Sequence, residues 1–214
     1  MNQAILFDFD GTLFQGTPEL NTWCFKGALE SMRLPPVTQD MIDQSIGLTF
    51  RQISILMTRT EDEEVLAHFK TETFRALPEY VERYIRPDPD VHAMLAELKK
   101  HARLAICSNA APEYLLPMLE ALKLFPFFDE IWYHTPGRTK AIAIPLLMKE
   151  LQAECAIFVG DRLEDVLSAR EAGIPVVGIR NRAYPEETDT ADAVVINHSQ
   201  MLEAILRLLN HKEE

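Results

Sequence analysis

The sequence predicts an α/β fold in which a doubly wound parallel-sheet core carries an inserted all-helical domain. Two observations carry this prediction. Short apolar runs alternate with helix-period segments after residue 84, as in βαβ units whose right-handed crossovers build a parallel sheet covered on both faces. Between residues 16 and 84, apolar residues recur only at helical spacing. We therefore expect a Rossmann-like core of residues 1–15 and 85–214, and a helical domain of residues 16–84.

Six apolar runs predict the strands. They are too short for helices and rich in the Ile, Val and aromatic residues that favour buried strands. They cover residues 4–7, 104–107, 131–133, 156–159, 176–179 and 193–196.

Helix-period segments fill the intervals between these runs. In the core we expect helices over 90–100, 112–122, 140–151, 163–172 and 200–209. Gly173, Ile174 and Pro175 should end the fourth of these and start the next strand, because a glycine followed by proline typically closes a helix. In the inserted domain we expect helices over 20–32, 40–45, 50–57 and 62–84.

Composition excludes several classes of function. The 214 residues include 33 acidic and 21 basic side chains, a formal charge of −12, which argues against nucleic acids and anionic membranes as partners. A phosphate-bearing substrate stays compatible, because a bound divalent cation can reverse the local field. No run of about 18 apolar residues predicts a membrane span, and two aspartates interrupt the apolar N-terminus, so we expect a cytoplasmic protein. The sequence leaves the oligomeric state open, as a monomer or a weak dimer.

Polar side chains follow four predicted strands at the point where each strand ends. Asp8 and Asp10 follow the first strand, Ser108 and Asn109 the second, a turn with Arg138 and Lys140 the third, and Asp161, Glu164 and Asp165 the fourth. Ligands bind open parallel sheets at the carboxyl ends of the strands. We therefore expect these side chains to form one site.

The residue types suit metal-assisted phosphoryl transfer. Asp8 and Asp10 point to the same side of an extended segment, and with Asp161 they offer the oxygen ligands that Mg²⁺ prefers. A carboxylate can attack phosphorus to form an acyl phosphate, while a second carboxyl moves protons to and from the oxygens. A cation and a hydroxyl would bind the phosphate oxygens; the spacing alone leaves Arg138 open beside Lys140, and Glu164 beside Asp165.

Four ordered segments resemble the haloacid dehalogenase superfamily, in its phosphoglycolate-phosphatase-like branch with a type 1 helical cap. They are ILFDFDGTL, ICSNA, Lys140 and VGDRLEDV, and they span Asp8 to Asp165. The residues after Lys140, Ala-Ile-Ala, depart from the proline-containing pattern of many relatives. The helical insertion after the first segment is similar to the family's cap.

The resemblance implies a role for each residue. Asp8 is the nucleophile and a metal ligand, and Asp10 is the general acid/base whose backbone carbonyl also binds Mg²⁺. Asp161 is a further ligand and Asp165 orients the shell around the metal. Ser108, Asn109 and Lys140 bind phosphate.

The expected function is that of a Mg²⁺-dependent phosphatase that hydrolyses a small organic phosphomonoester through an aspartyl phosphate. A phosphosugar mutase and a non-catalytic phosphatase-like binding protein are the alternatives. Thr12 favours the phosphatase over the mutases of this branch, which more often carry Val there, and the intact set of polar residues disfavours a non-catalytic protein.

One residue of the inserted domain is a candidate for binding the rest of the substrate. Gly47 to Arg51 predict a turn into a helix that Thr49 caps. A helix N-terminus and a guanidinium both suit anions. We therefore expect Arg51 to contact a distal anionic group of the substrate.

Overall fold

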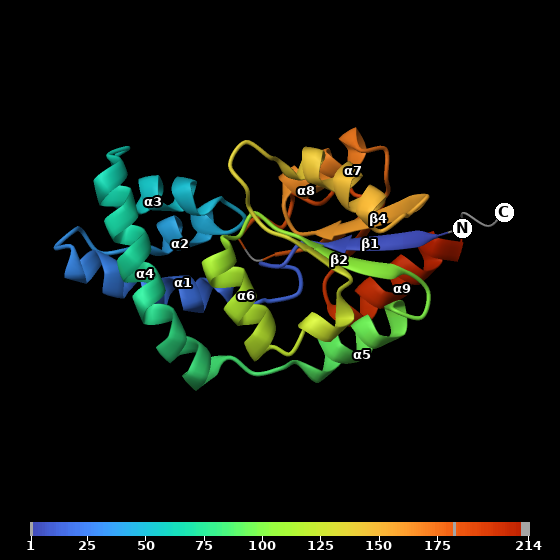
Figure 1. Ribbon diagram of the computed structural model, residues 1–214, viewed down its shortest axis with the longest axis horizontal. Coiled ribbons are helices and arrows are strands. Elements are labelled where there is room, and N and C mark those ends of the chain that lie inside the picture. Colours follow the sequence, from blue (N-terminus) through green and yellow to red (C-terminus); the bar gives the residue numbers. More distant parts are fainter. Residues whose placement is uncertain (1, 182, 211–214) are drawn as a thin grey trace.

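The computed structural model describes residues 2–181 and 183–210 and confirms the predicted α/β class. Six parallel strands form one sheet in the order β3-β2-β1-β4-β5-β6. Their bounds are β1 Gln3–Phe7, β2 Arg103–Cys107, β3 Glu130–Trp132, β4 Cys155–Gly160, β5 Val176–Ile179 and β6 Ala193–Val195. Each strand overlaps its predicted run, and the order reverses beside β1, which places that strand at the centre of the sheet (Figure 1).

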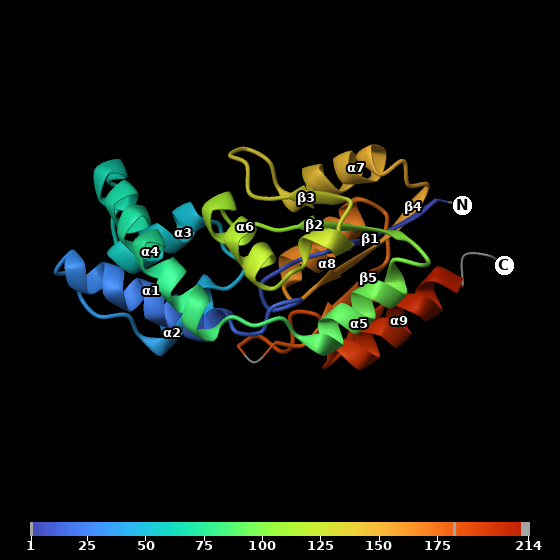
Figure 2. The same cartoon turned by 60° about the horizontal axis from the view of Figure 1, so that its bottom comes forward.

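Helices cover both faces of the sheet (Figures 1 and 2). Helices α7 and α8 lie on one face, and α5, α6 and α9 pack on the other. Their bounds are α5 Pro89–Leu98, α6 Pro112–Ala121, α7 Lys140–Glu150, α8 Leu163–Glu171 and α9 His198–Asn210. A short 3₁₀ helix, η1 Phe125–Phe127, was not predicted, because three residues carry no readable period.

Strand β1 shows why the sheet is buried on both sides. Ile5 and Phe7 belong to the core under α5, α6 and α9, whereas Ala4 and Leu6 belong to the core under α7 and α8. All four side chains are inaccessible to solvent. Alternate residues of a strand face opposite ways, so a run that is apolar at every position marks a strand covered on both faces.

Four helices, which we call the cap, gather at the end of the sheet where β1 and β2 deliver their carboxyl ends (Figure 1). They are α1 Thr17–Ser31, α2 Gln39–Ser45, α3 Phe50–Thr58 and α4 Glu63–Tyr84. The predicted N-cap of α3 is present: the Thr49 side chain accepts a hydrogen bond from the backbone N–H of Gln52. The division into a core of 1–15 and 85–214 and a cap domain of 16–84 stays a proposal, and all four cap helices fall inside those limits.

The expected glycine turn at the end of α8 is present. Gly173 has a φ of +70° where α8 ends, a left-handed conformation that glycine adopts without steric cost. Among the helices of residues 2–181 and 183–210, none has both the length and the apolar character needed to cross a membrane.

Candidate active site

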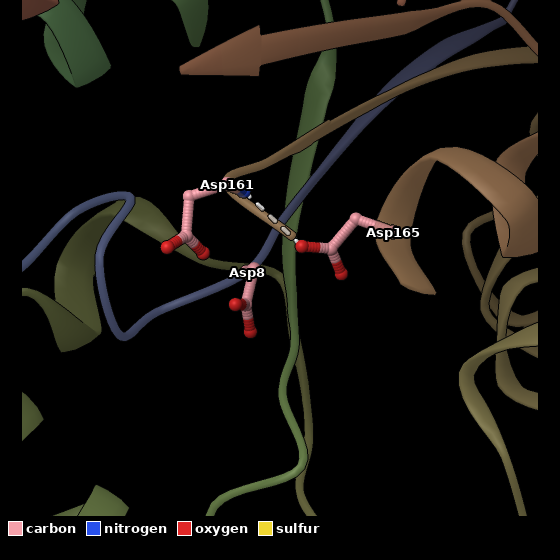
Figure 3. Close-up of side chains that lie close together, drawn as sticks. All are labelled: Asp8, Asp161 and Asp165. Carbon is pink, nitrogen blue, oxygen red and sulfur yellow. Dashed lines mark hydrogen bonds between the residues drawn. The ribbon is translucent and has the colours of Figure 1, made fainter. Parts of the chain in front are cut away.

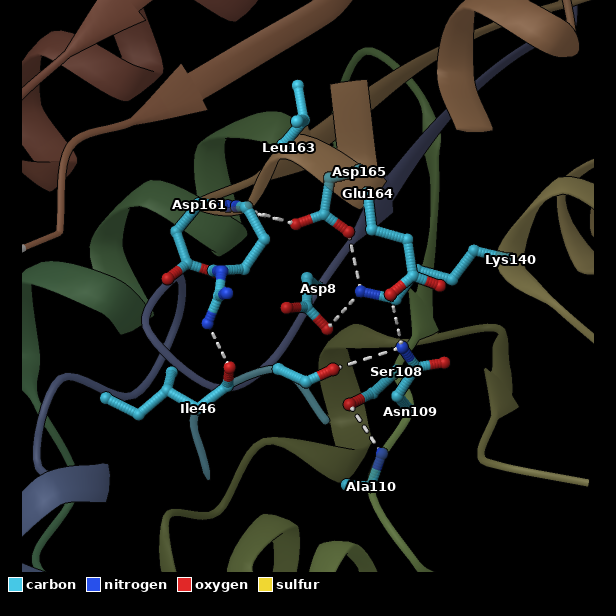
Figure 4. Close-up of polar contacts among 12 residues, drawn as sticks. Asp8, Ile46, Ser108, Asn109, Ala110, Lys140, Asp161, Leu163, Glu164 and Asp165 are labelled. Carbon is cyan, nitrogen blue, oxygen red and sulfur yellow. Dashed lines mark hydrogen bonds and ion pairs between the residues drawn. The ribbon is translucent and has the colours of Figure 1, made fainter. Parts of the chain in front are cut away.

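The polar residues that follow β1, β2 and β4 meet at one edge of the sheet. Asp8 continues β1, Ser108 continues β2 and Asp161 continues β4. All three side chains are at most 2% exposed. Burying polar groups is unfavourable unless they are paired. The contacts among these side chains therefore show which polar groups are already paired and which are free to bind a ligand (Figure 4).

Lys140, at the start of α7, lies between two carboxylates. Its Nζ is 2.9 Å from Asp8 Oδ1 and 2.6 Å from Asp165 Oδ1, and all three side chains are buried. The competing residues, Arg138 and Glu164, are exposed. The structure therefore brings Lys140 rather than Arg138 to the site, and places Asp165 rather than Glu164 against that lysine.

Burial and charge shift the pKa values of this cluster. Burial raises the pKa of Asp8 to about 7, because desolvation and the charges of Asp165 and Asp10 outweigh the attraction of Lys140. For Lys140, burial alone would lower the pKa, but Asp165 and Asp8 together hold it well above its usual value. The ammonium therefore stays charged, whereas burial and the neighbouring carboxylates also raise the pKa of Asp161 well above its usual value.

Three carboxylates are close enough to share a metal ion. Oxygen atoms of Asp8, Asp161 and Asp165 lie within 4.8 Å of one another (Figure 3). Both Asp165 oxygens are already engaged, Oδ1 by Lys140 and Oδ2 by the backbone N–H groups of Asp161 and Arg162. Asp165 therefore holds the loop and the lysine in place, and the oxygens of Asp8 and Asp161 are better placed to bind a cation.

One carboxylate oxygen of Asp161 lacks a hydrogen-bond partner among the described residues. Its Oδ2 accepts a hydrogen bond of 2.8 Å from Asn181 Nδ2, but its buried Oδ1 has no partner among the described residues. An unpaired buried carboxylate oxygen is costly, and a hard cation would satisfy it. The donor set therefore fits a divalent metal ion.

The glycine that follows Asp10 permits the close approach of β1 and β4 residues. Gly11 has a φ of +78°, and a Cβ atom there would lie 2.1 Å from Asp161 Oδ2. Only glycine fits this position without displacing Asp161.

Asp10 faces the cap rather than the other carboxylates. Its Oδ1 accepts hydrogen bonds from Thr17 Oγ1, at 2.8 Å, and from Tyr114 Oη, at 2.6 Å. Burial raises the pKa of Asp10 against the opposing effect of these two bonds. Since Oδ1 is occupied, Oδ2 is the oxygen that can carry a proton. No motif in the sequence indicates Thr17 or Tyr114 as site residues, because the packing of α1 and α6 is what brings them to Asp10.

Ser108 and Asn109 differ in whether their side chains keep a hydrogen-bond donor free. Ser108 Oγ accepts a hydrogen bond from the Ala110 N–H, which leaves its own O–H able to donate. Asn109 Nδ2 donates to the Gly47 carbonyl at 3.2 Å and to Glu164 Oε2 at 3.0 Å. The amide group thus joins the cap to the core through Gly47 and binds α8 through Glu164, and the main-chain N–H is what Asn109 can offer to a phosphate.

Arg162 forms a second connection between core and cap that the sequence did not indicate. Its Nη1 donates to the Ile46 carbonyl, its Nε is 2.7 Å from Glu187 Oε2, and its guanidinium lies 4.5 Å from the centre of the Tyr184 ring. Glu187 and Tyr184 lie in an irregular segment between β5 and β6, where no periodic pattern marks them.

Arg51 is not brought to this site. It is exposed on the cap and pairs with Glu63 Oε1 at 2.7 Å, a contact between two helices that residue spacing cannot foresee. The proposals below do not use it.

The chain is similar to known proteins over most of its length. Residues 5–179 match the family model described as haloacid dehalogenase-like hydrolase. A phosphoglycolate phosphatase of Caulobacter vibrioides is 28% identical over 96% of this chain and 92% of its own length. One from Rhodospirillum rubrum is 29% identical over 87% of this chain and 83% of its own length.

Solved structures share the fold. A protein described as a predicted phosphoglycolate phosphatase from Haemophilus somnus superposes with a TM-score of 0.83 at 24% identity, over 95% of this chain and 98% of that one. A β-phosphoglucomutase of Clostridium difficile gives a TM-score of 0.81 at 17% identity, over 99% of each chain. Because the family model covers most of its length and its fold agrees, the chain belongs to the haloacid dehalogenase-like hydrolases.

Proposed function

We propose that this enzyme is a Mg²⁺-dependent phosphatase that hydrolyses a small phosphomonoester through a phosphorylated Asp8. The observation that carries the proposal is the buried cluster in which Lys140 bridges Asp8 and Asp165 while Asp161 keeps an unpaired oxygen. The family membership supports hydrolysis, and the phosphoglycolate phosphatase relatives support a phosphate ester as substrate.

Asp8, Asp161 and the Asp10 backbone carbonyl would hold the Mg²⁺, and Asp165 would orient the shell around it. When bound, Mg²⁺ supplies positive charge beside the transferring phosphoryl group. Lys140 supplies a second, fixed positive charge, because its carboxylate partners keep it protonated. The Ser108 O–H and the Asn109 main-chain N–H would donate to the phosphate oxygens.

The carboxylates divide the chemical work. Asp8 attacks phosphorus, a new Asp8 O–P bond forms, and the P–O bond to the alcohol breaks. Asp10 donates the proton on its Oδ2 to the departing alkoxide. Water then attacks the phosphorus while Asp10 removes a proton from that water, the Asp8 O–P bond breaks, and inorganic phosphate is released. The hydrogen bonds from Thr17 and Tyr114 hold Asp10 in place, to face the leaving oxygen in the first step and the water in the second.

Release of inorganic phosphate from p-nitrophenyl phosphate with Mg²⁺ tests this proposal. Asp8→Asn should abolish turnover, because an amide is a poor nucleophile of nearly the same shape. Asp10→Asn should lower kcat by about 10²–10⁴-fold, the usual value of general acid–base catalysis. Circular dichroism should show both variants folded, and near-normal turnover by folded Asp8→Asn would refute the assignment.

A further inference from the structure

A hollow beside Asp10 is the place where the alcohol part of the substrate would lie. Its enclosed volume is about 50 Å³, room for a small group, and the space around it is open to solvent. Its lining includes Asp10 and Tyr114, together with Ala110 and Ala111, which follow Ser108 and Asn109 in the chain. The residue expected to protonate the leaving oxygen therefore lines this hollow.

The rest of the lining comes from the cap and is largely apolar. It includes Leu20, Phe25, Phe50, Ile53, Phe74 and Leu77. Among the described residues that line the hollow, none is Lys or Arg, and Asp10 is the one that is acidic. A carboxylate on the substrate would have to leave water without a cation to pair with, which is strongly unfavourable.

One polar atom in this lining lacks a partner. Thr73 is 3% exposed and its Oγ1 makes no hydrogen bond with the described residues. Thr71 on the same helix, in contrast, donates to the Ala67 carbonyl. Elsewhere in the cap wall, Asn21 Nδ2 donates to Ser45 Oγ, which in turn donates to the Ile42 carbonyl. Thr73 therefore contributes a hydroxyl that no described residue engages.

A second hollow, lined by Asp161, does not include Asp10. Of its described lining residues, Glu19, Asp43 and Asp88 are acidic, and Arg180 is paired with Asp189 at 2.6 Å. That hollow lacks the proton donor and its acidic residues disfavour an anion. The leaving alcohol belongs in the first hollow.

From the lining of this hollow and the free hydroxyl of Thr73 we infer that the substrate is the phosphate ester of an uncharged, mainly apolar alcohol that carries one hydrogen-bonding group. An ester with a carboxylate on the alcohol part, such as phosphoglycolate, is a poor substrate. This inference rests on the proposed function and adds the substrate class to it.

A matched pair of esters tests the inference with the Mg²⁺-loaded enzyme. 4-Methylphenyl phosphate and 4-carboxyphenyl phosphate have similar shape and differ in the charge at the distal end. We expect kcat/KM to favour the methyl compound by at least about tenfold, because the carboxylate must be desolvated without a partner. The carboxyl compound has the better leaving group, so intrinsic reactivity cannot produce this preference. Equal or higher kcat/KM for the carboxyl compound would overturn the inference.

Two variants on helix α3 test whether the preference for the methyl ester arises in this hollow. Ile53 lines the hollow and is partly buried, whereas Ile55, also partly buried, does not line it. Ile53→Lys should reduce the preference for the methyl ester at least tenfold by supplying a cation, while Ile55→Lys should leave it unchanged. A folded Ile53→Lys variant with unaltered preference would show that the alcohol binds elsewhere.

Binding separates failure of this inference from failure of the proposed function. Calorimetry would compare 4-methylbenzylphosphonate with 4-carboxybenzylphosphonate, which cannot be hydrolysed, in the presence of Mg²⁺. Tighter binding of the methyl compound supports the inference even if neither ester is turned over, a result that would refute only the phosphatase proposal. Tighter binding of the carboxyl compound refutes the inference whatever the turnover.

Discussion

Lys140 is a charged residue that the site can bury only because carboxylates surround it. It is 2% exposed and contacts both Asp8 and Asp165. Removing one partner of a buried ion pair usually costs several kcal/mol, because the remaining charge is left without compensation. Lys140 therefore makes the stability of the core depend on Asp165.

Asp165→Asn should consequently destabilise the protein, whereas the matched change Glu164→Gln should not. We expect the first to lower the free energy of unfolding by about 3 kcal/mol, and the second to change it by less than about 0.5 kcal/mol, as for most surface substitutions. Urea denaturation followed by circular dichroism measures both. Equal effects of the two substitutions would show that Asp165 does not hold the lysine.

At the scale of a single element, the turn after β1 decides how closely β1 and β4 residues approach. Gly11 and Gly137 both have a φ of +78°, but a Cβ would clash with Asp161 only at Gly11, while nothing lies within 4 Å at Gly137. Alanine at either position therefore has the same backbone strain, roughly 1–2 kcal/mol. Only Gly11→Ala also displaces Asp161, the carboxylate that we propose binds the metal.

We expect Gly11→Ala to lower kcat/KM for p-nitrophenyl phosphate by about 10²-fold, since small displacements of catalytic groups have effects of that size. Gly137→Ala should retain activity within a few-fold and lose a similar amount of stability. Steady-state kinetics and thermal unfolding of the two variants test this pair. Similar kinetic losses would attribute the effect to backbone strain instead.

At the scale of the whole molecule, the buried carboxylates make stability depend on pH and on the metal. The ordinary pKa of an aspartate side chain is 3.8, and burial raises that of Asp8 to about 7 in the fold. Its proton therefore stabilises the folded state fully below about pH 3.8, and this contribution is lost as the pH rises through about 7. Mg²⁺ competes with the same proton.

With a chelator, Asp8→Asn should become more stable relative to the wild type as the pH rises from about 5 to about 8. Mg²⁺ should raise the Tm of the wild type more at about pH 8 than at about pH 5.5. The Asp8→Asn protein should show a smaller shift. Scanning fluorimetry at several pH values provides the measurement, and a Mg²⁺ shift that falls with rising pH would contradict it.

The three cysteines report on burial across the molecule. All three are free; Cys24 and Cys107 are buried and Cys155 is partly exposed. Burial raises the pKa of Cys24 to about 12 and that of Cys107 above its usual value. Since the thiolate is the reactive form, Ellman's reagent should titrate one thiol in the native protein and three in guanidinium chloride. Rapid reaction of two or more native thiols would contradict this packing.

The sequence by itself determined the element types and the order in which site residues leave the sheet. Apolar runs, helical periodicity and the turn at Gly173 depend on neighbouring residues in the sequence. All six strands and the core and cap helices could therefore be predicted to within a few residues. Asp8, Ser108 and Asp161 were predictable as neighbours, because parallel strands present their carboxyl ends at one edge.

Tertiary structure alone decided which groups touch. Lys140 rather than Arg138, and Asp165 rather than Glu164, are buried at the site because α7 and α8 turn those side chains inward. The contact of Tyr114 with Asp10 and the apolar hollow around Thr73 join segments distant in sequence. The contacts of Thr17 with Asp10 and of Arg51 with Glu63 join successive segments whose relative orientation residue spacing does not give. Residue spacing predicts which side chains share one face of a helix or strand. The relative placement of the helices determines which of those side chains come into contact, and it also shapes the hollow that we propose for the alcohol.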